Sequence, residues 1–194
     1  MHKMQNSNTR QDTTGKRKRL IYLAGFMGSG KSTVGPILAN TLGFEFIDID
    51  KMIEEKTEQP VVQIFDSVGE TGFRGIERAA LQEISGLDGY VVSLGGGTIA
   101  NDENFRLVQN TGIVVYLHLP PEEILHRVKH KQDRPMLKDV SGNPLPQNEL
   151  AERIEQLLKS REQFYGRADI IISTDKKKIG ATVDEIVRKL NAIA

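Results

Sequence analysis

The sequence has no cysteine, no excess of either charge and no long hydrophobic run. Without cysteine the chain can form no disulfide, thiolate metal site or cysteine nucleophile, which fits a reducing compartment. Lys plus Arg and Asp plus Glu each number 26 in 194 residues, so no overall positive field favours nucleic acid as a partner. No apolar stretch approaches the ~20 residues of a membrane-spanning helix, and the N-terminus has no apolar export segment. We expect a single cytoplasmic domain with neither a nucleic-acid nor a membrane partner.

Residues 1–19 are polar, contain no aromatic residue and end in a basic run. This composition predicts a disordered N-terminal extension, followed by one domain at 20–194. In an alternative interpretation, Lys16 to Arg19 dock on nucleic acid or another acidic surface, although short charge runs are usually solvated. A truncation that leaves activity intact would support the disordered interpretation.

Strand-like and helix-like segments alternate from Leu20 onward. Apolar runs predict five strands, at 20–24, 44–49, 90–97, 113–119 and 168–173. Helical spacing predicts helices at 31–43, 50–57, 61–68, 73–84, 101–109, 121–130, 149–165 and 181–193, with the third and fourth joined at Gly69. Strands separated by helices predict an α/β fold, a three-layer αβα sandwich around a five-stranded parallel sheet.

The segment from Gly25 to Ser32 fits the pattern G-x-x-x-x-G-K-[ST] and lies between a predicted strand and a predicted helix. Glycines let backbone N–H groups point inward, and the helix N-terminus adds its positive dipole end, so the loop is suited to phosphate. Lys31 would reach the β and γ phosphates, and the Ser32 hydroxyl would bind Mg²⁺. The predicted nucleotide-binding set is Gly28, Ser29, Gly30, Lys31, Ser32 and Thr33. A glycine loop that merely turns the chain is the alternative.

Two acids follow in "FIDID", at the end of the second predicted strand. Strand residues two apart point to one face, so we expect Asp48 and Asp50 to project together toward the phosphate loop. One acid can hold Mg²⁺ through water, and the other can accept a hydrogen bond from an attacking hydroxyl. The alternative makes Asp50 a helix N-cap and Asp48 a surface residue.

The third predicted strand ends in "LGGG", whose glycines allow a ligand to approach the backbone closely. A bare tight turn is the alternative. Ser93 stands where many phosphate-loop enzymes place an acid that organises magnesium, so Asp48 is the better candidate for the metal side.

Six motifs occur in the order and approximate spacing of one known family: "GFMGSGKST", "DID", "GETGFRGIE", "SLGGG", "RPML" and "REQFY". Together they resemble shikimate kinase, and the resemblance covers the chain from Leu20 to Ala194. It implies a P-loop kinase fold with a lid and transfer of the γ-phosphoryl group of ATP to the 3-hydroxyl of shikimate, with Mg²⁺ bound alongside the nucleotide.

The resemblance also implies roles for residues at the matching positions. Asp50 looks like the residue that binds ring hydroxyls and is the candidate base. Arg74 and Arg161 resemble the two partners of the substrate carboxylate, and Gly96 the donor of a backbone N–H to substrate. Arg134 resembles the lid arginine on the ATP phosphates.

The phosphate and metal side follows the same resemblance. Lys31 resembles the phosphate ligand, and Ser32 and Asp48 the magnesium ligands. A substrate with one carboxylate and several hydroxyls calls for guanidinium groups and a carboxylate acceptor, which agrees with these assignments.

Each arginine also has a purely structural alternative. Arg74 could pair with Glu70 or Glu77 on its own helix. Arg161 could pair in the same way with Glu155 or Glu162.

Two further segments have implied roles. Arg127 resembles a residue that stacks on adenine, although "HRVKHK" could equally be a solvated helix face. Residues 134–147, rich in proline, are interpreted as a mobile lid that closes over bound ligands and excludes water, with a static surface loop as the alternative.

Two other function classes stay open on the sequence. A kinase for gluconate or a nucleotide would share the phosphate loop but would not need Asp50, Arg74 and Arg161 together. A nucleotide-dependent switch without catalysis would bind ATP without turnover, and the presence of Asp50 and Arg134 argues against it. The expected ligands are shikimate and ATP, and we expect a monomer.

Overall fold

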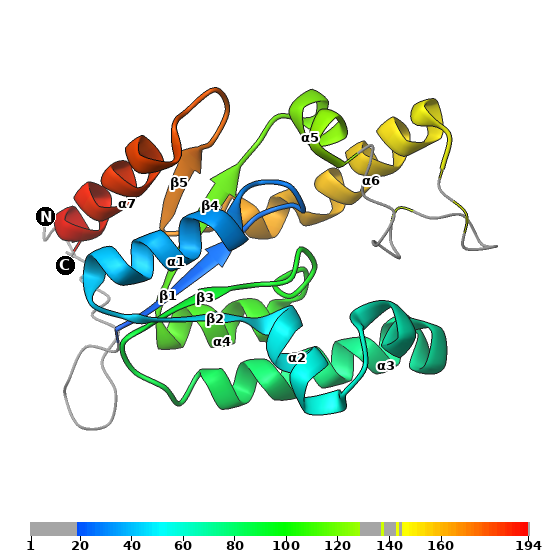
Figure 1. The fold of residues 1–194 in the computed structure, drawn as a ribbon, viewed down its shortest axis with the longest axis horizontal. Helices are drawn as coiled ribbons and strands as arrows, with labels where there is room; N and C mark the ends of the chain where they lie inside the picture. The colour runs from blue at the N-terminus through cyan, green and yellow to red at the C-terminus, as the bar shows by residue number, and fades with distance from the viewer. Residues whose placement is uncertain (1–18, 129–136, 138–142, 144, 194) are drawn as a thin grey trace, which may run out of the picture.

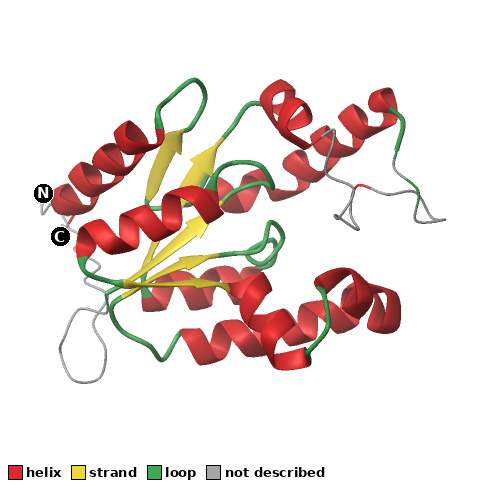
Figure 2. Ribbon diagram, in the orientation of Figure 1, coloured by secondary structure: helices red, strands yellow, loops and turns green. Residues whose placement is uncertain are grey.

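The computed structural model describes residues 19–128, 137, 143 and 145–193. Five parallel strands form one sheet in the order β2-β3-β1-β4-β5 (Figure 1). The strands are β1 (Leu20–Ala24), β2 (Glu45–Asp48), β3 (Tyr90–Ser93), β4 (Ile113–His118) and β5 (Ile170–Ser173). The helices are α1 (Lys31–Leu42), α2 (Ile49–Thr57), α3 (Val61–Ile84), α4 (Asp102–Thr111), α5 (Pro121–Val128), α6 (Gln147–Tyr165) and α7 (Ile179–Ile193). Strands and helices alternate along most of the chain, as predicted (Figure 2).

Helices cover both faces of the sheet, so the predicted three-layer αβα sandwich is confirmed (Figure 1). Alternate residues of β1 point to opposite faces. Ile21 and Leu23 pack with α1 and α7, whereas Leu20 and Tyr22 pack with α2, α3 and α4. A third apolar cluster joins Phe26 to α5 and α6 beyond the carboxyl ends of the strands. This cluster fixes α6 beside the edge where ligands bind in such sheets.

Helix α3 is interrupted where the sequence predicts a junction. Gly69 has φ 69° and ψ −178°, so the helix changes direction between residues 61–68 and 70–84. A positive φ of this size is easy for glycine and strained for other residues. The kink sets the direction of the segment that carries Arg74.

The second strand is shorter than predicted. It ends at Asp48, and Asp50 lies in the first turn of α2. The Asp48 side chain accepts hydrogen bonds from the backbone N–H groups of Asp50 (3.1 Å) and Lys51 (3.4 Å), which caps the helix. The expectation that Asp48 and Asp50 share one strand face is therefore wrong, because the cap starts a helix before Asp50. The alternative prediction, in which Asp50 is the helix N-cap, is also wrong, because the N-cap of α2 is Asp48.

Parts of the sequence-based prediction lie outside the described residues. The N-terminal extension is described only at Arg19, whose guanidinium pairs with Asp88 at 3.1 Å. The segment proposed as a lid, 134–147, is described only at 137, 143 and 145–147. Within the described ranges, no helix has the length and apolar character needed to cross a membrane.

Candidate active site

The loop between β1 and α1 has the local structure of a phosphate-binding loop. Gly30 is the N-cap of α1 with φ 103°, and Gly28 has φ 81°, conformations that favour glycine. The Lys31 ammonium is buried and donates to the carbonyl oxygens of Gly25 (2.7 Å) and Phe26 (3.2 Å). A buried cation thus lies beside the positive end of α1, which makes an anion site.

Ser32 and Asp48 lie together next to this loop. The Ser32 hydroxyl donates to Oδ2 of Asp48 at 3.3 Å, while Oδ1 of the same carboxylate caps α2. Mg²⁺ in phosphate sites is commonly held by one or two carboxylates, waters and the phosphates themselves. The hydroxyl and the carboxylate form a pair of oxygen ligands that fits such an ion.

The glycine loop after β3 is packed closely by polar side chains. A Cβ on Gly95 would lie 2.7 Å from Oε1 of Glu77, 2.9 Å from Oγ1 of Thr98 and 3.0 Å from Oδ1 of Asp50. These side chains come from α3, from the glycine loop itself and from α2, so they converge on one point. Gly95 is required there because any larger residue would displace the carboxylates.

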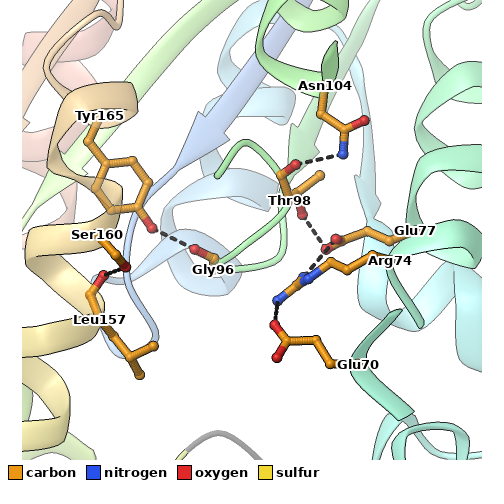
Figure 3. Close-up of polar contacts among 9 residues, drawn as sticks. All are labelled: Glu70, Arg74, Glu77, Gly96, Thr98, Asn104, Leu157, Ser160 and Tyr165. Carbon is orange, nitrogen blue, oxygen red and sulfur yellow. Dashed lines mark hydrogen bonds and ion pairs between the residues drawn. The ribbon is translucent and has the colours of Figure 1, made fainter. Parts of the chain in front are cut away.

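Arg74 is held by a chain of hydrogen bonds that reaches α4 (Figure 3). Its Nη1 donates to Oε2 of Glu77 at 2.7 Å, and Oε1 of Glu77 accepts from Oγ1 of Thr98 at 2.5 Å. The Thr98 carbonyl accepts from the side-chain amide of Asn104 at 2.7 Å. Glu70 accepts a further bond from Arg74 at 3.2 Å. The network engages both terminal nitrogens of the guanidinium and so fixes Arg74 where it lines the pocket.

The charges in this network stabilise each other. Burial works against the positive charge of Arg74, but the carboxylates of Glu77 and Glu70 outweigh it and raise the pKa of the guanidinium above its usual value. Glu77 has no exposed surface, and a buried carboxylate needs this kind of partner. The buried Glu77 therefore holds Arg74, which lines the pocket, in place.

Arg161 lies on α6 at the same pocket. Its side chain is buried, and its Nη1 has no hydrogen-bond partner within the described part of the chain. The guanidinium lies 5.2 Å from the centre of the Phe26 ring, a cation–π contact. An unpartnered buried donor indicates a ligand that completes its hydrogen bonding.

The two arginines line a pocket of about 260 Å³. The other lining residues come from α3, α6 and the loop after β3, and they are Glu70, Gly97, Ala100, Asn101, Leu157 and Ser160. Two guanidinium groups facing one small cavity favour a small carboxylate or phosphate.

Known proteins of this architecture share much of the sequence. The family model described as shikimate kinase matches residues 27–191. The shikimate kinase of Chlorobaculum tepidum is 48% identical over 175 residues, which cover 90% of this chain and 92% of that protein. A solved structure of shikimate kinase from Acinetobacter baumannii in complex with shikimate matches with a TM-score of 0.82 at 35% identity, covering 90% of this chain and 94% of that one. The shikimate kinase from Bacteroides thetaiotaomicron gives a TM-score of 0.80 at 34% identity, covering 89% and 98%.

The chain belongs to the shikimate kinase family. Membership makes it a P-loop kinase with ATP as cosubstrate, so the predicted fold and enzyme class are confirmed. The gluconate-kinase, nucleotide-kinase and non-catalytic alternatives are set aside.

Most of the predicted shikimate-kinase site residues gather at the carboxyl edge of the sheet. Arg74 and Arg161 line one pocket, and a Cβ on Gly96 would lie 3.3 Å from Nη1 of Arg161. Arg127 donates from Nη1 to the Gly28 carbonyl at 3.0 Å, so it lies against the phosphate loop. Arg134 lies outside the described residues. The ion pairs predicted as a structural alternative for Arg74 are also present, because it pairs with both Glu70 and Glu77. Arg161 pairs with neither Glu155 nor Glu162.

The residues that hold this pocket in place are not predicted from the sequence. The sequence predicts Glu77 only as a possible partner of Arg74, yet it is buried with Phe73, Ala80 and Leu81 on one face of α3. A lone carboxylate on an apolar helical stripe is the signal that could have found it. Thr98 has no such signal, and Tyr165 stands only as the last residue of the motif "REQFY". Their contacts join elements far apart in the sequence.

Proposed function

We propose that the protein transfers the γ-phosphoryl group of ATP to the 3-hydroxyl of shikimate, giving shikimate 3-phosphate and ADP. A bond forms between the substrate oxygen and the γ-phosphorus while the bond to the β,γ-bridging oxygen breaks, and the hydroxyl proton leaves to a base. The observation that carries this proposal is the pocket in which Arg74 and Arg161 face one small cavity. Membership of the shikimate kinase family and the likeness to a shikimate complex support it.

On the acceptor side, Arg74 and Arg161 bind the substrate carboxylate. The backbone N–H of Gly96 donates a further hydrogen bond to substrate. Asp50 accepts a hydrogen bond from the reacting hydroxyl and is the candidate base. Its place against the glycine loop supports that role, since its Oδ1 would lie 3.0 Å from a Cβ on Gly95.

On the donor side, the backbone of residues 28–33 holds the phosphates and Lys31 neutralises their charge. The loop geometry around Gly28 and Gly30 supports this assignment. Ser32 and Asp48 hold Mg²⁺, which, when bound, neutralises charge on the transferred phosphoryl group. Arg134 contacts the ATP phosphates from a lid formed by 134–147, and Arg127 contacts the adenine. Catalysis then rests on positioning and charge neutralisation.

We further infer a cytoplasmic monomer that acts on small molecules and has no nucleic-acid or membrane partner. The equal numbers of acidic and basic residues support the absence of a nucleic-acid partner. Size-exclusion chromatography with light scattering tests the oligomeric state, and a dimer mass would contradict this inference.

The test of the function is ADP release from purified protein with Mg·ATP and each of shikimate, quinate, gluconate and nucleoside monophosphates. We expect turnover that depends on shikimate. Asp50→Asn and Arg74→Ala are expected to lose it by at least about a hundredfold while ATP binding is retained, because both act on the acceptor. Turnover with another acceptor and none with shikimate would show that the pocket takes a different acid.

A further inference from the structure

Tyr165, the last residue of α6, links that helix to the glycine loop. Its side chain is 3% exposed, and its hydroxyl donates to the Gly96 carbonyl at 2.7 Å (Figure 3). The ring is stacked on Tyr116 of β4, with the centroids 4.6 Å apart and the planes 18° apart. The hydroxyl is therefore held in one direction by the packing of the ring.

The protonation state of Tyr165 suits a donor. Burial raises its pKa above the ordinary value and outweighs Arg161, which acts on the hydroxyl through both its charge and a hydrogen bond, and the charge of Arg74. Both guanidinium groups favour the phenolate. The neutral phenol keeps its single proton and donates it in the hydrogen bond to the Gly96 carbonyl oxygen.

The bond to Gly96 also orients the next N–H group. The Gly96 carbonyl and the Gly97 N–H belong to one peptide unit, and the described chain contains no cis peptide, so the two groups point in opposite directions. With the carbonyl turned toward Tyr165, the Gly97 N–H points away from it. Gly97 lines the pocket, and a Cβ there would lie 2.5 Å from Nη2 of Arg74.

The N–H groups of this loop are available to a ligand. Thr98 N–H donates to the Gly95 carbonyl (3.1 Å), and Ala100 N–H donates to the Gly97 carbonyl (3.0 Å). Within the described residues, the N–H groups of Gly96 and Gly97 donate to no protein acceptor. A peptide between two glycines rotates easily, so this arrangement needs an external anchor.

We propose that Tyr165 is a positioning residue whose hydroxyl fixes the Gly96–Gly97 peptide, so that the Gly97 N–H is directed at the acidic substrate between Arg74 and Arg161. This inference rests on the proposed function. It assigns to the tyrosine an effect on acceptor binding, exerted through the backbone, with no contact to ATP or to the reacting atoms.

The test is Tyr165→Phe, which keeps the ring and removes only the hydroxyl. We expect the KM for shikimate to rise about tenfold, the scale of one lost buried hydrogen bond. The KM for ATP and kcat are expected to change less than about twofold, because the donor site is not touched.

Two other tyrosines provide matched controls. Tyr116→Phe alters the same stacked pair, but among the described residues its hydroxyl has no hydrogen-bond partner, so we expect an unchanged KM for shikimate. Tyr22→Phe removes a bond of 2.8 Å to Thr111, away from the pocket. It should lower the melting temperature as Tyr165→Phe does and leave the KM unchanged, which separates a general loss of stability from a loss of positioning.

An independent measurement uses the parent protein labelled with ¹⁵N. We expect the Gly97 amide resonance to shift as shikimate is added without nucleotide. A Gly97 resonance unmoved by saturating shikimate would overturn the proposal, even if Tyr165→Phe failed to fold. An unchanged KM in Tyr165→Phe, with a fully active parent, would overturn the role of Tyr165 alone. A parent with no shikimate-dependent ADP release would overturn the proposed function itself.

Discussion

The two arginines of the pocket are held by different means. Arg74 is fixed by carboxylates, with Glu77 on one nitrogen and Glu70 on another. Arg161 is fixed by burial against Phe26 and keeps an unpartnered nitrogen among the described residues. The charge of Arg74 is already compensated by two carboxylates, so it attracts an anionic ligand less strongly, but it presents a fixed geometry. Arg161 offers a buried N–H donor, with which a carboxylate ligand forms the stronger hydrogen bond.

Glu77→Gln tests the support of Arg74. The substitution removes a fully buried negative charge beside a guanidinium, and we expect a loss of about 2–3 kcal/mol in the free energy of unfolding, together with a higher KM for shikimate. Urea unfolding and steady-state kinetics measure both. The matched control is Glu70→Gln, whose side chain is 55% exposed and should change stability by less than about 1 kcal/mol. Equal effects of the two changes would contradict a special role for Glu77.

Asp48 has two duties that a pair of substitutions can separate. Asp48→Asn keeps an efficient N-cap on α2 but removes the charge beside Ser32, so we expect a higher Mg²⁺ requirement with little loss of stability. Asp48→Ala removes both the N-cap and the charge, so it should also lower the free energy of unfolding by about 1 kcal/mol. Activity against Mg²⁺ concentration, with thermal unfolding of each variant, gives the comparison. A Mg²⁺ requirement that Asp48→Asn leaves unchanged would exclude Asp48 from the metal site.

At the scale of elements, local patterns were enough for most of the fold. Apolar runs and capping glycines such as Gly43 predicted the strands and helices of the described residues, although the third strand ends at Ser93 and not at 97, and Gly69 marked the break in α3. The end of β2 was misplaced because "FIDID" keeps the alternation of a strand, while the cap formed by Asp48 had no competing signal. The contacts of Thr98 and Tyr165 were not predicted because tertiary packing alone brings their partners close, whereas the pairing of Glu77 with Arg74 is local and only the burial of Glu77 was not predicted.

In α3, replacing glycine by alanine should change the free energy of unfolding in opposite directions at two positions. Gly69→Ala places a Cβ in open space but forces φ 69° on an alanine, so we expect a loss of about 1–2 kcal/mol. Gly75→Ala, in the regular part of the same helix and also in open space, should gain about 0.5–1 kcal/mol. Urea unfolding of both variants measures the difference. A stabilising Gly69→Ala would mean that the kink straightens at no cost.

For the whole molecule, the site is assembled at one edge of the sheet from parts that the core holds independently. The phosphate loop follows β1, the Ser32–Asp48 pair joins α1 to the end of β2, and the pocket lined by Arg74 and Arg161 lies between α3, α6 and the loop after β3. Tyr116 and Tyr165 belong to the same core cluster as Tyr22, so the aromatic layer that supports the pocket also stabilises the fold. Stability and substrate binding should therefore fail together when this layer is charged.

This coupling predicts a loss of stability at alkaline pH. Burial raises the pKa of Tyr22 to about 12, and that of Tyr116 to about 12, while an unfolded tyrosine titrates near ~10. The neutral phenol is favoured in the folded state, so its contribution is complete below pH ~10 and is lost as the pH rises toward ~12. For Tyr22 the loss is at most about 3 kcal/mol. Urea unfolding at successive pH values should show it, and Tyr22→Phe should show a shallower fall. Native phenolate absorbance in which these tyrosines ionise near pH ~10 would contradict the burial on which the prediction rests.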